Sequence, residues 1–200
     1  MDKKVICLTG FGPFAGNESC NASWEAVKRL PEEITVKNHS FRLEKLEVPV
    51  MYTDVDKTVP EIWKQDPILV IHCGVHGSTD KILLEKCAFK NCYGRPDWDG
   101  KCLPTSSADL CGHGQNCDRL ETKFNVDKIA EELNQGKGEP LFETSTDVGS
   151  YLCGYIYVKS LDFSLDKTLF IHVPKEFIMN PTVVKQGILD VVHKCLDQIL

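Results

Sequence analysis

Short runs that are apolar at nearly every position alternate along this chain with stretches whose apolar residues recur at helical spacing. Residues 5–9, 68–73 and 169–173 form such runs, which are typical of strands buried on both faces of a parallel sheet. Helical spacing is found in residues 24–30, 55–63, 124–133, 151–163 and 183–199. The alternation predicts an α/β fold, a three-layer α/β/α sandwich around a mainly parallel, twisted sheet.

The length of the chain agrees with a single domain. A domain of 200 residues buries about 70% of its unfolded surface, so it folds without a disulfide or a structural metal. Since no repeat or linker interrupts the chain, we expect one domain over residues 1–200. Residues 91–119 lose the periodicity and are rich in Gly, Pro, Asp, Ser and Cys, which predicts a long irregular Cys-rich excursion.

Three segments have ambiguous patterns. Apolar and polar residues alternate in residues 34–50 as in a strand. The apolar positions change from odd to even numbers between Leu43 and Leu46, which predicts a bulge or two strands. Pro60 predicts a kink in its helix or a later helix start. Residues 81–89 are typical of one strand with Glu85 in its middle. That carboxylate either faces water from an edge strand or is buried with a hydrogen-bonding partner.

The distribution of charge excludes two classes of partner. The chain has 29 acidic and 23 basic residues, interspersed, and a net charge of −6. Because it lacks a basic tract, we expect neither nucleic acid nor an anionic membrane as a partner. No apolar run is long enough to span a bilayer, and the first is too short for a signal peptide. We therefore expect a cytoplasmic protein whose cysteines form no disulfides.

Residues 145–155 carry the strongest chemical signal, because they are typical of a strand end, a tight glycine turn and a helix start. Cys153 then lies in the first helical turn, where unpaired backbone N–H groups and the helix dipole stabilise an anion. The thiolate is the reactive form of cysteine, so Cys153 is the candidate nucleophile. The alternative is a small buried thiol on an apolar helix, and spacing alone favours that alternative.

A cysteine nucleophile needs an imidazole that moves the proton and a group that orients the imidazole. His172 ends an apolar strand just before Pro174, where a parallel sheet presents functional side chains, although a core histidine is the alternative. His76 lies in a glycine-flanked turn and is a rival base. His72 lies within a strand and is expected in the core.

Two further groups of residues have two interpretations each. Phe11 and Phe14 follow the first strand in a Gly-rich loop, so they either fill the core or line a ligand pocket. Cysteines and a histidine in the excursion offer metal ligands, but their spacings are unlike those of zinc sites and include no C-x-x-C pair. We expect no metal and no cofactor. The cysteines and the histidine weighed here as metal ligands are Cys92, Cys102, Cys111, His113 and Cys117.

Four separate segments resemble the signatures of one peptidase family, in the order in which the family carries them. They are residues 9–14 with 21–24 (TGFGPF and NASW), 84–87 (LEKC), 147–153 (DVGSYLC) and 170–174 (FIHVP). Together they resemble the type I pyroglutamyl peptidases, also called pyrrolidone-carboxylate peptidases, in the animal rather than the bacterial form. Residues 77–80 differ from the Gly-Gly-Arg segment of bacterial members, which leaves loop contacts open.

The resemblance implies a cysteine peptidase that removes an N-terminal pyroglutamyl residue from peptides. By motif, Cys153 is the nucleophile, His172 the general base and acid, and Glu85 the orienting acid. The resemblance also implies that Phe11, Phe14 and Tyr151 line the pyroglutamate pocket, and that the protein is a monomer. The three catalytic and three pocket residues are Cys153, His172, Glu85, Phe11, Phe14 and Tyr151.

Two rival hypotheses are weighed against this one. The first is a catalytically inactive relative that binds pyroglutamyl peptides or a protein partner. The second is a zinc-stabilised interaction module centred on residues 91–119. Retention of a cysteine, a histidine and a glutamate in matching segments argues against the first, and stoichiometric zinc in the purified protein would favour the second.

Overall fold

The computed structural model describes residues 3–14 and 20–200 of the chain. Its centre is a seven-stranded sheet with the strand order β2-β3-β1-β4-β9-β5-β8. Pairs β1–β3, β1–β4, β4–β9 and β5–β8 are parallel, whereas β2–β3 and β5–β9 are antiparallel. The strands are β1 (Lys4–Phe11), β2 (Glu33–Val36), β3 (His39–Val48), β4 (Leu69–Val75), β5 (Ile82–Glu85), β8 (Phe142–Ser145) and β9 (Thr168–Val173).

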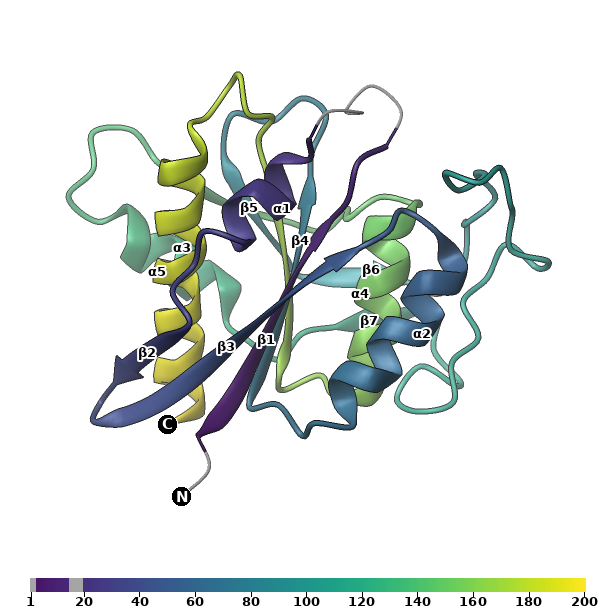
Figure 1. Cartoon of the computed structure of the whole chain (residues 1–200), viewed down its shortest axis with the longest axis horizontal. Helices are drawn as coiled ribbons and strands as arrows, with labels where there is room; N and C mark the ends of the chain where they lie inside the picture. Colours follow the sequence, from purple (N-terminus) through teal and green to yellow (C-terminus); the bar gives the residue numbers. More distant parts are fainter. Residues whose placement is uncertain (1–2, 15–19) are drawn as a thin grey trace.

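Helices cover both faces of this sheet, so the predicted three-layer α/β/α sandwich is confirmed (Figure 1). On one face lie α1 (Ala22–Val27), α3 (Val126–Asn134) and α5 (Pro181–Ile199). On the other face lie α2 (Tyr52–Trp63) and α4 (Leu152–Phe163). Each interface has its own apolar core, and the central strands β4 and β9 are buried on both faces, as their continuous apolar runs predict.

The strand prediction for residues 34–50 is corrected in its position. Two strands do form, but the break lies at Lys37 and Asn38, both with positive φ (48° and 65°), as a tight hairpin turn requires. The region between Leu43 and Leu46 is continuous within β3. Of the two alternatives for Pro60, a kink or a later helix start, the later start is wrong, because α2 begins at Tyr52 and contains Pro60.

Residues 81–89 form two strands rather than the one predicted. The first is β5, and the second is β6 (Cys87–Phe89), which pairs with β7 (Arg119–Glu121) in a separate two-stranded sheet beside α4. Lys86 lies at the break: its N–H donates to the carbonyl of Ser145, while its carbonyl accepts from Thr122. The chain therefore leaves the main sheet directly after Glu85.

Between β6 and β7 the chain forms neither helix nor strand beyond one isolated bridge, Asn91 to Ser107. Buried residues of this excursion, including Tyr93 and Leu110, join the core around α4. Asp162 of α4 holds one part of it with its carboxylate. None of the helices in the described part of the chain combines the length and apolar character needed to cross a bilayer.

Candidate active site

Cys153 is placed by the turn that joins β8 to α4. The N–H of Gly149 donates to Asp147 Oδ1 at 3.0 Å, and the N–H of Asp147 donates to Ser145 Oγ at 3.1 Å. Gly149 has a φ of 80°, a conformation that favours glycine. This turn leads directly into α4, whose first two residues are Leu152 and Cys153.

The N-terminus of α4 has no side-chain cap. Helices α1, α3 and α5 each have one, from Asn21, Asn125 and Asn180, whose side chains accept a backbone N–H of the first turn. The N-cap residue of α4, Tyr151, makes no such bond. Backbone N–H groups in the first turn of α4, beside the Cys153 thiol, therefore remain available to another acceptor.

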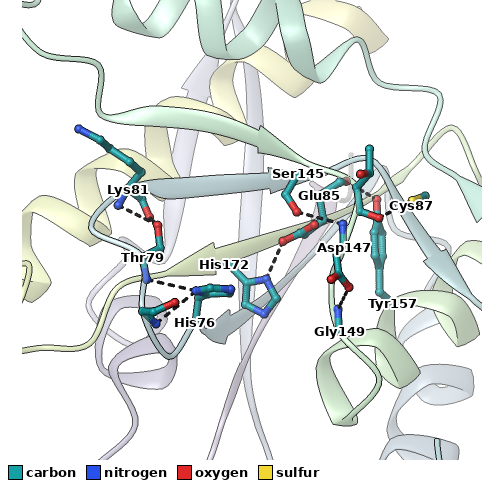
Figure 2. A network of polar contacts seen from close by, with 12 residues as sticks. His76, Thr79, Lys81, Glu85, Cys87, Ser145, Asp147, Gly149, Tyr157 and His172 are labelled. Atoms are coloured by element: carbon teal, nitrogen blue, oxygen red, sulfur yellow. Dashed lines mark hydrogen bonds and ion pairs between the residues drawn. The ribbon is translucent and has the colours of Figure 1, made fainter. Parts of the chain in front are cut away.

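His172 and Glu85 form a buried pair, with 2.7 Å between His172 Nδ1 and Glu85 Oε1 (Figure 2). Their exposed fractions are 4% and 0%. The interpretation of Glu85 as an edge-strand residue facing water is thus wrong, because β5 lies between β9 and β8. In the antiparallel register Glu85 is opposite Phe170, so its carboxylate reaches His172 diagonally across the two strands.

Two aromatic side chains hold this pair in place. Tyr157 of α4 donates its hydroxyl to the backbone carbonyl of Glu85 at 2.9 Å. The ring of Phe170 contacts that of His172, with centroids 4.9 Å apart. Glu85 Oε2 is buried and has no hydrogen-bond partner among the described residues, so the imidazole is the main compensation for this buried carboxylate.

Protonation of His172 is favoured by its neighbours. Burial lowers the pKa of His172, but hydrogen bonds to Cys153 and Glu85, together with their negative charges, raise it to about 9. Because Nδ1 contacts Glu85, Nε2 is the ring nitrogen left for Cys153. The pair therefore suits a thiolate beside an imidazolium, which is the reactive state of a cysteine nucleophile.

Room for the thiol depends on Gly74, which lies opposite His172 in the β4–β9 pairing. A Cβ atom added to Gly74 would lie 2.6 Å from Cys153 Sγ and 2.8 Å from the ring of Phe170. Only glycine at this position lets the thiol approach the backbone of β4.

Cys153 and His172 border a cavity of about 470 Å³. Phe11, Phe14 and Tyr151 line the same cavity, so the structure brings all three predicted pocket residues to the thiol. Phe11 is also 4% exposed and joins a core cluster, so its two interpretations are compatible. Glu85 lies behind His172, outside the cavity lining.

The remaining candidate histidines differ from His172. His76 Nδ1 accepts the N–H groups of Ser78 (3.4 Å) and Thr79 (3.2 Å), so its proton lies on Nε2 when the ring is neutral. Its ring centroid is 5.4 Å from that of His172. His72 is completely buried, as predicted, and its Nδ1 lies 2.8 Å from Thr9 Oγ1. Burial lowers the pKa of His72 to about 3.

Metal ligands do not converge in the described residues, where no three His, Cys, Asp or Glu side chains form a group that could hold an ion. The hypothesis of a zinc-stabilised module therefore has no ligand set there. Sequence reasoning did not identify Gly74 or Tyr157 as parts of the site. A glycine at the end of a buried apolar strand was the available signal for Gly74, whereas nothing distinguishes Tyr157 from other apolar-helix positions.

Comparison with known proteins gives a consistent result. A family model described as pyroglutamyl peptidase matches residues 3–199. Human pyroglutamyl-peptidase 1 is 32% identical over 178 residues, covering 86% of this chain and 79% of the relative. The pyrrolidone-carboxylate peptidase of Lactobacillus acidophilus is 33% identical over 189 residues, covering 91% and 87%. Among solved structures, the pyrrolidone carboxyl peptidase of Thermococcus litoralis shares the fold, with a TM-score of 0.83, 22% identity and coverage of 97% and 94%.

Proposed function

This chain belongs to the pyroglutamyl peptidase family of cysteine-type hydrolases, which remove N-terminal pyroglutamate from peptides, and we propose that Cys153, His172 and Glu85 carry out that reaction. The observation that carries the proposal is the pairing of His172 with Glu85 at 2.7 Å beside a thiol that borders a cavity. A nucleophile, a base and an orienting carboxylate are the three groups that the reaction needs.

The proposed reaction begins with attack of the Cys153 thiolate on the carbonyl carbon that joins pyroglutamate to the next residue. Backbone N–H groups in the first turn of α4 stabilise the oxyanion, and removal of one such donor costs about 100-fold in rate or more. His172 donates its proton to the departing amine, which leaves a thioester on Cys153. His172 then takes a proton from water, and the resulting hydroxide attack releases pyroglutamate and the free thiol.

The cavity lining supports pyroglutamate as the acyl group. Pyroglutamate is a flat, neutral lactam without an ammonium group, so it needs aromatic surfaces and backbone hydrogen bonds rather than a carboxylate that binds an amine. Phe11, Phe14 and Tyr151 offer such surfaces around the cavity. We propose that these three side chains bind the lactam ring.

The decisive experiment measures release of a fluorophore from a pyroglutamyl amide. The wild-type protein should release it and should lose this activity on treatment with iodoacetamide, whereas Cys153→Ala should be inactive. Cys117→Ala is the matched control, because that thiol is exposed and does not border the cavity. Retained turnover in Cys153→Ala would mean that the nucleophile is misassigned. Binding of a pyroglutamyl peptide without product would favour the inactive-relative alternative.

We further propose that the enzyme acts as a cytoplasmic monomer without a cofactor, on pyroglutamyl peptides and not on nucleic acid. The interspersed charges and the net charge of −6 support the part of this proposal that excludes nucleic acid. Sedimentation of the active protein at the mass of one chain, 22.5 kDa, would agree with it, whereas activity confined to a larger species would contradict it.

A further inference from the structure

Two cations border the cavity without a part in the proposed acyl chemistry. Arg95 and Lys175 both line it, and neither forms an ion pair within the described residues. Asp147 is the only carboxylate among the described lining residues, and its Oδ1 already accepts the N–H of Gly149. The net charge of the chain is −6, so an excess of positive charge at this cavity runs against the composition of the protein.

Arg95 is held in place rather than free in solvent. Its guanidinium carbon lies 4.5 Å from the centroid of the Tyr151 ring, and its backbone carbonyl accepts the Tyr52 hydroxyl at 2.9 Å. Asp97 anchors the same segment to α2, because its Oδ2 accepts the N–H of Tyr52 at 3.2 Å. A cation positioned in advance loses little conformational entropy when it binds a ligand.

Lys175 lines the cavity from a different segment, three residues after His172 and directly after Pro174. It is half-buried, whereas Arg95 is exposed, so both side chains line the cavity while remaining open to solvent. Because both cations reach solvent while His172 is buried, they lie where the cavity opens to solvent, and the rest of a bound peptide must leave through that opening. The buried His172 lies deeper, beside the thiol.

We propose that Arg95 and Lys175 form a leaving-group subsite that favours substrates with a carboxylate just after the pyroglutamyl residue, an inference that rests on the proposed function. The pyroglutamyl group is neutral and gives these cations no partner. The carboxylate comes either from an acidic side chain or from the free C-terminus of a dipeptide. Asp147 is the one described lining group that opposes this attraction.

The expected effect is moderate, because the pairs form near solvent. A single exposed ion pair changes affinity by about 2- to 5-fold, and added salt screens it. Because the carboxylate binds equally in the ground state and the transition state, the preference should lie mainly in KM rather than in kcat.

The test compares three substrates: pyroglutamyl-alanine amide, pyroglutamyl-alanine with a free carboxylate, and pyroglutamyl-glutamate amide. At low ionic strength we expect kcat/KM to be about 2- to 5-fold higher for each carboxylate substrate than for the neutral amide, and the ratio to approach one at about 1 M salt. A gain with only one of the two identifies which carboxylate the subsite binds. Equal rates for all three overturn the proposal, while hydrolysis of the neutral amide still upholds the proposed function.

Two variants assign the effect to its residues. Arg95→Gln and Lys175→Gln should each lower the ratio of carboxylate to amide rates toward one, by less than the full 2- to 5-fold preference of the wild type, about 2-fold each. Lys57→Gln is the matched control, because Lys57 is exposed on α2 and does not line the cavity. Equal losses on all three substrates would assign the cations to the common acyl group and overturn the proposal. An unchanged ratio in both variants would overturn it as well.

Discussion

Glu85 reaches His172 between two strands that run in opposite directions, and the two residues are diagonal neighbours rather than a directly opposed pair. Leu83 occupies the position opposite His172, while Glu85 faces Phe170. Diagonal neighbours on adjacent strands are within reach of long side chains, so the carboxylate of Glu85 can approach Nδ1 of His172. The contact between Glu85 and His172 therefore depends on the reversal of β5.

Glu85→Gln should shift the alkaline limit of activity. The pKa of His172 lies at about 9, above its ordinary value of 6.5. In the proposed reaction the imidazolium is the form that donates a proton to the leaving amine. Activity should thus fall as pH rises through about 9. The variant loses one of the charges that raise this pKa, so its limit should move to lower pH, with kcat reduced about 100-fold or more.

The measurement is kcat/KM against pH for both proteins. An alkaline limit at the same pH in Glu85→Gln would contradict the pairing. Folding provides an independent check, because a raised pKa in the folded state stabilises the protein below about pH 6.5 and that contribution is lost as pH rises through about 9. The difference in the free energy of unfolding between wild type and variant should shrink over that range.

Gly74→Ala should inactivate the enzyme without removing any functional side chain. The added methyl group would lie 2.6 Å from Cys153 Sγ and 2.8 Å from Phe170, so the thiol has to move. A misplacement of about 1 Å costs on the order of 100-fold in rate. Alkylation by iodoacetamide should slow as well. Gly138→Ala, which meets no atom within 4 Å and has no positive φ, is the control. Normal kinetics in Gly74→Ala would mean that the thiol reacts from another position.

His76 should prove dispensable as a base. Its Nδ1 accepts two backbone N–H groups, and its pKa is lowered by burial and by the charge of His172. His76→Asn keeps an acceptor for the turn, so activity should stay within a few-fold of wild type, whereas His172→Ala should lose about 100-fold or more. Steady-state kinetics on the pyroglutamyl amide decide the matter. Comparable losses in the two variants would make His76 part of the proton transfer.

The sequence pattern predicts some of these features and misses others for physical reasons. A continuous apolar run identifies β9, and a glycine turn before an apolar stretch identifies the start of α4. Periodicity does not report strand direction, so the reversal of β5 was not predicted. The connection of residues 76–81 held the missing information, because a parallel crossover needs about a dozen residues or more.

Contacts between residues far apart in the sequence were the second kind of feature that the sequence pattern could not predict. Asp97 caps α2, and Tyr157 supports Glu85, across separations that no local pattern encodes. Two strands within residues 34–50 were one of the two expected alternatives, the other being a bulge, but the change of alternation between Leu43 and Leu46 indicated the wrong place for the turn. There the partly exposed face of β3 relaxes the alternation, so the pattern changes while the strand continues.

Asp162→Asn should loosen the excursion while leaving the sheet intact. The buried carboxylate accepts three backbone N–H groups, from Cys111 (2.9 Å), Gly112 (2.9 Å) and Gly114 (2.6 Å). Asparagine has one acceptor oxygen, so its amide N–H₂ would face at least one of these donors. The free energy of unfolding should fall by about 1–3 kcal/mol.

Hydrogen exchange locates this effect. The amides of residues 111–114 should exchange faster in Asp162→Asn, whereas those of β4 and β9 should change only by the global loss of stability. Asp166→Asn is the control, since Asp166 is an exposed partner of Lys123 and its ion pair is worth about 1 kcal/mol at most. Unchanged exchange at residues 111–114 would mean that packing of Tyr93 and Leu110 against α4, rather than the carboxylate, holds the excursion.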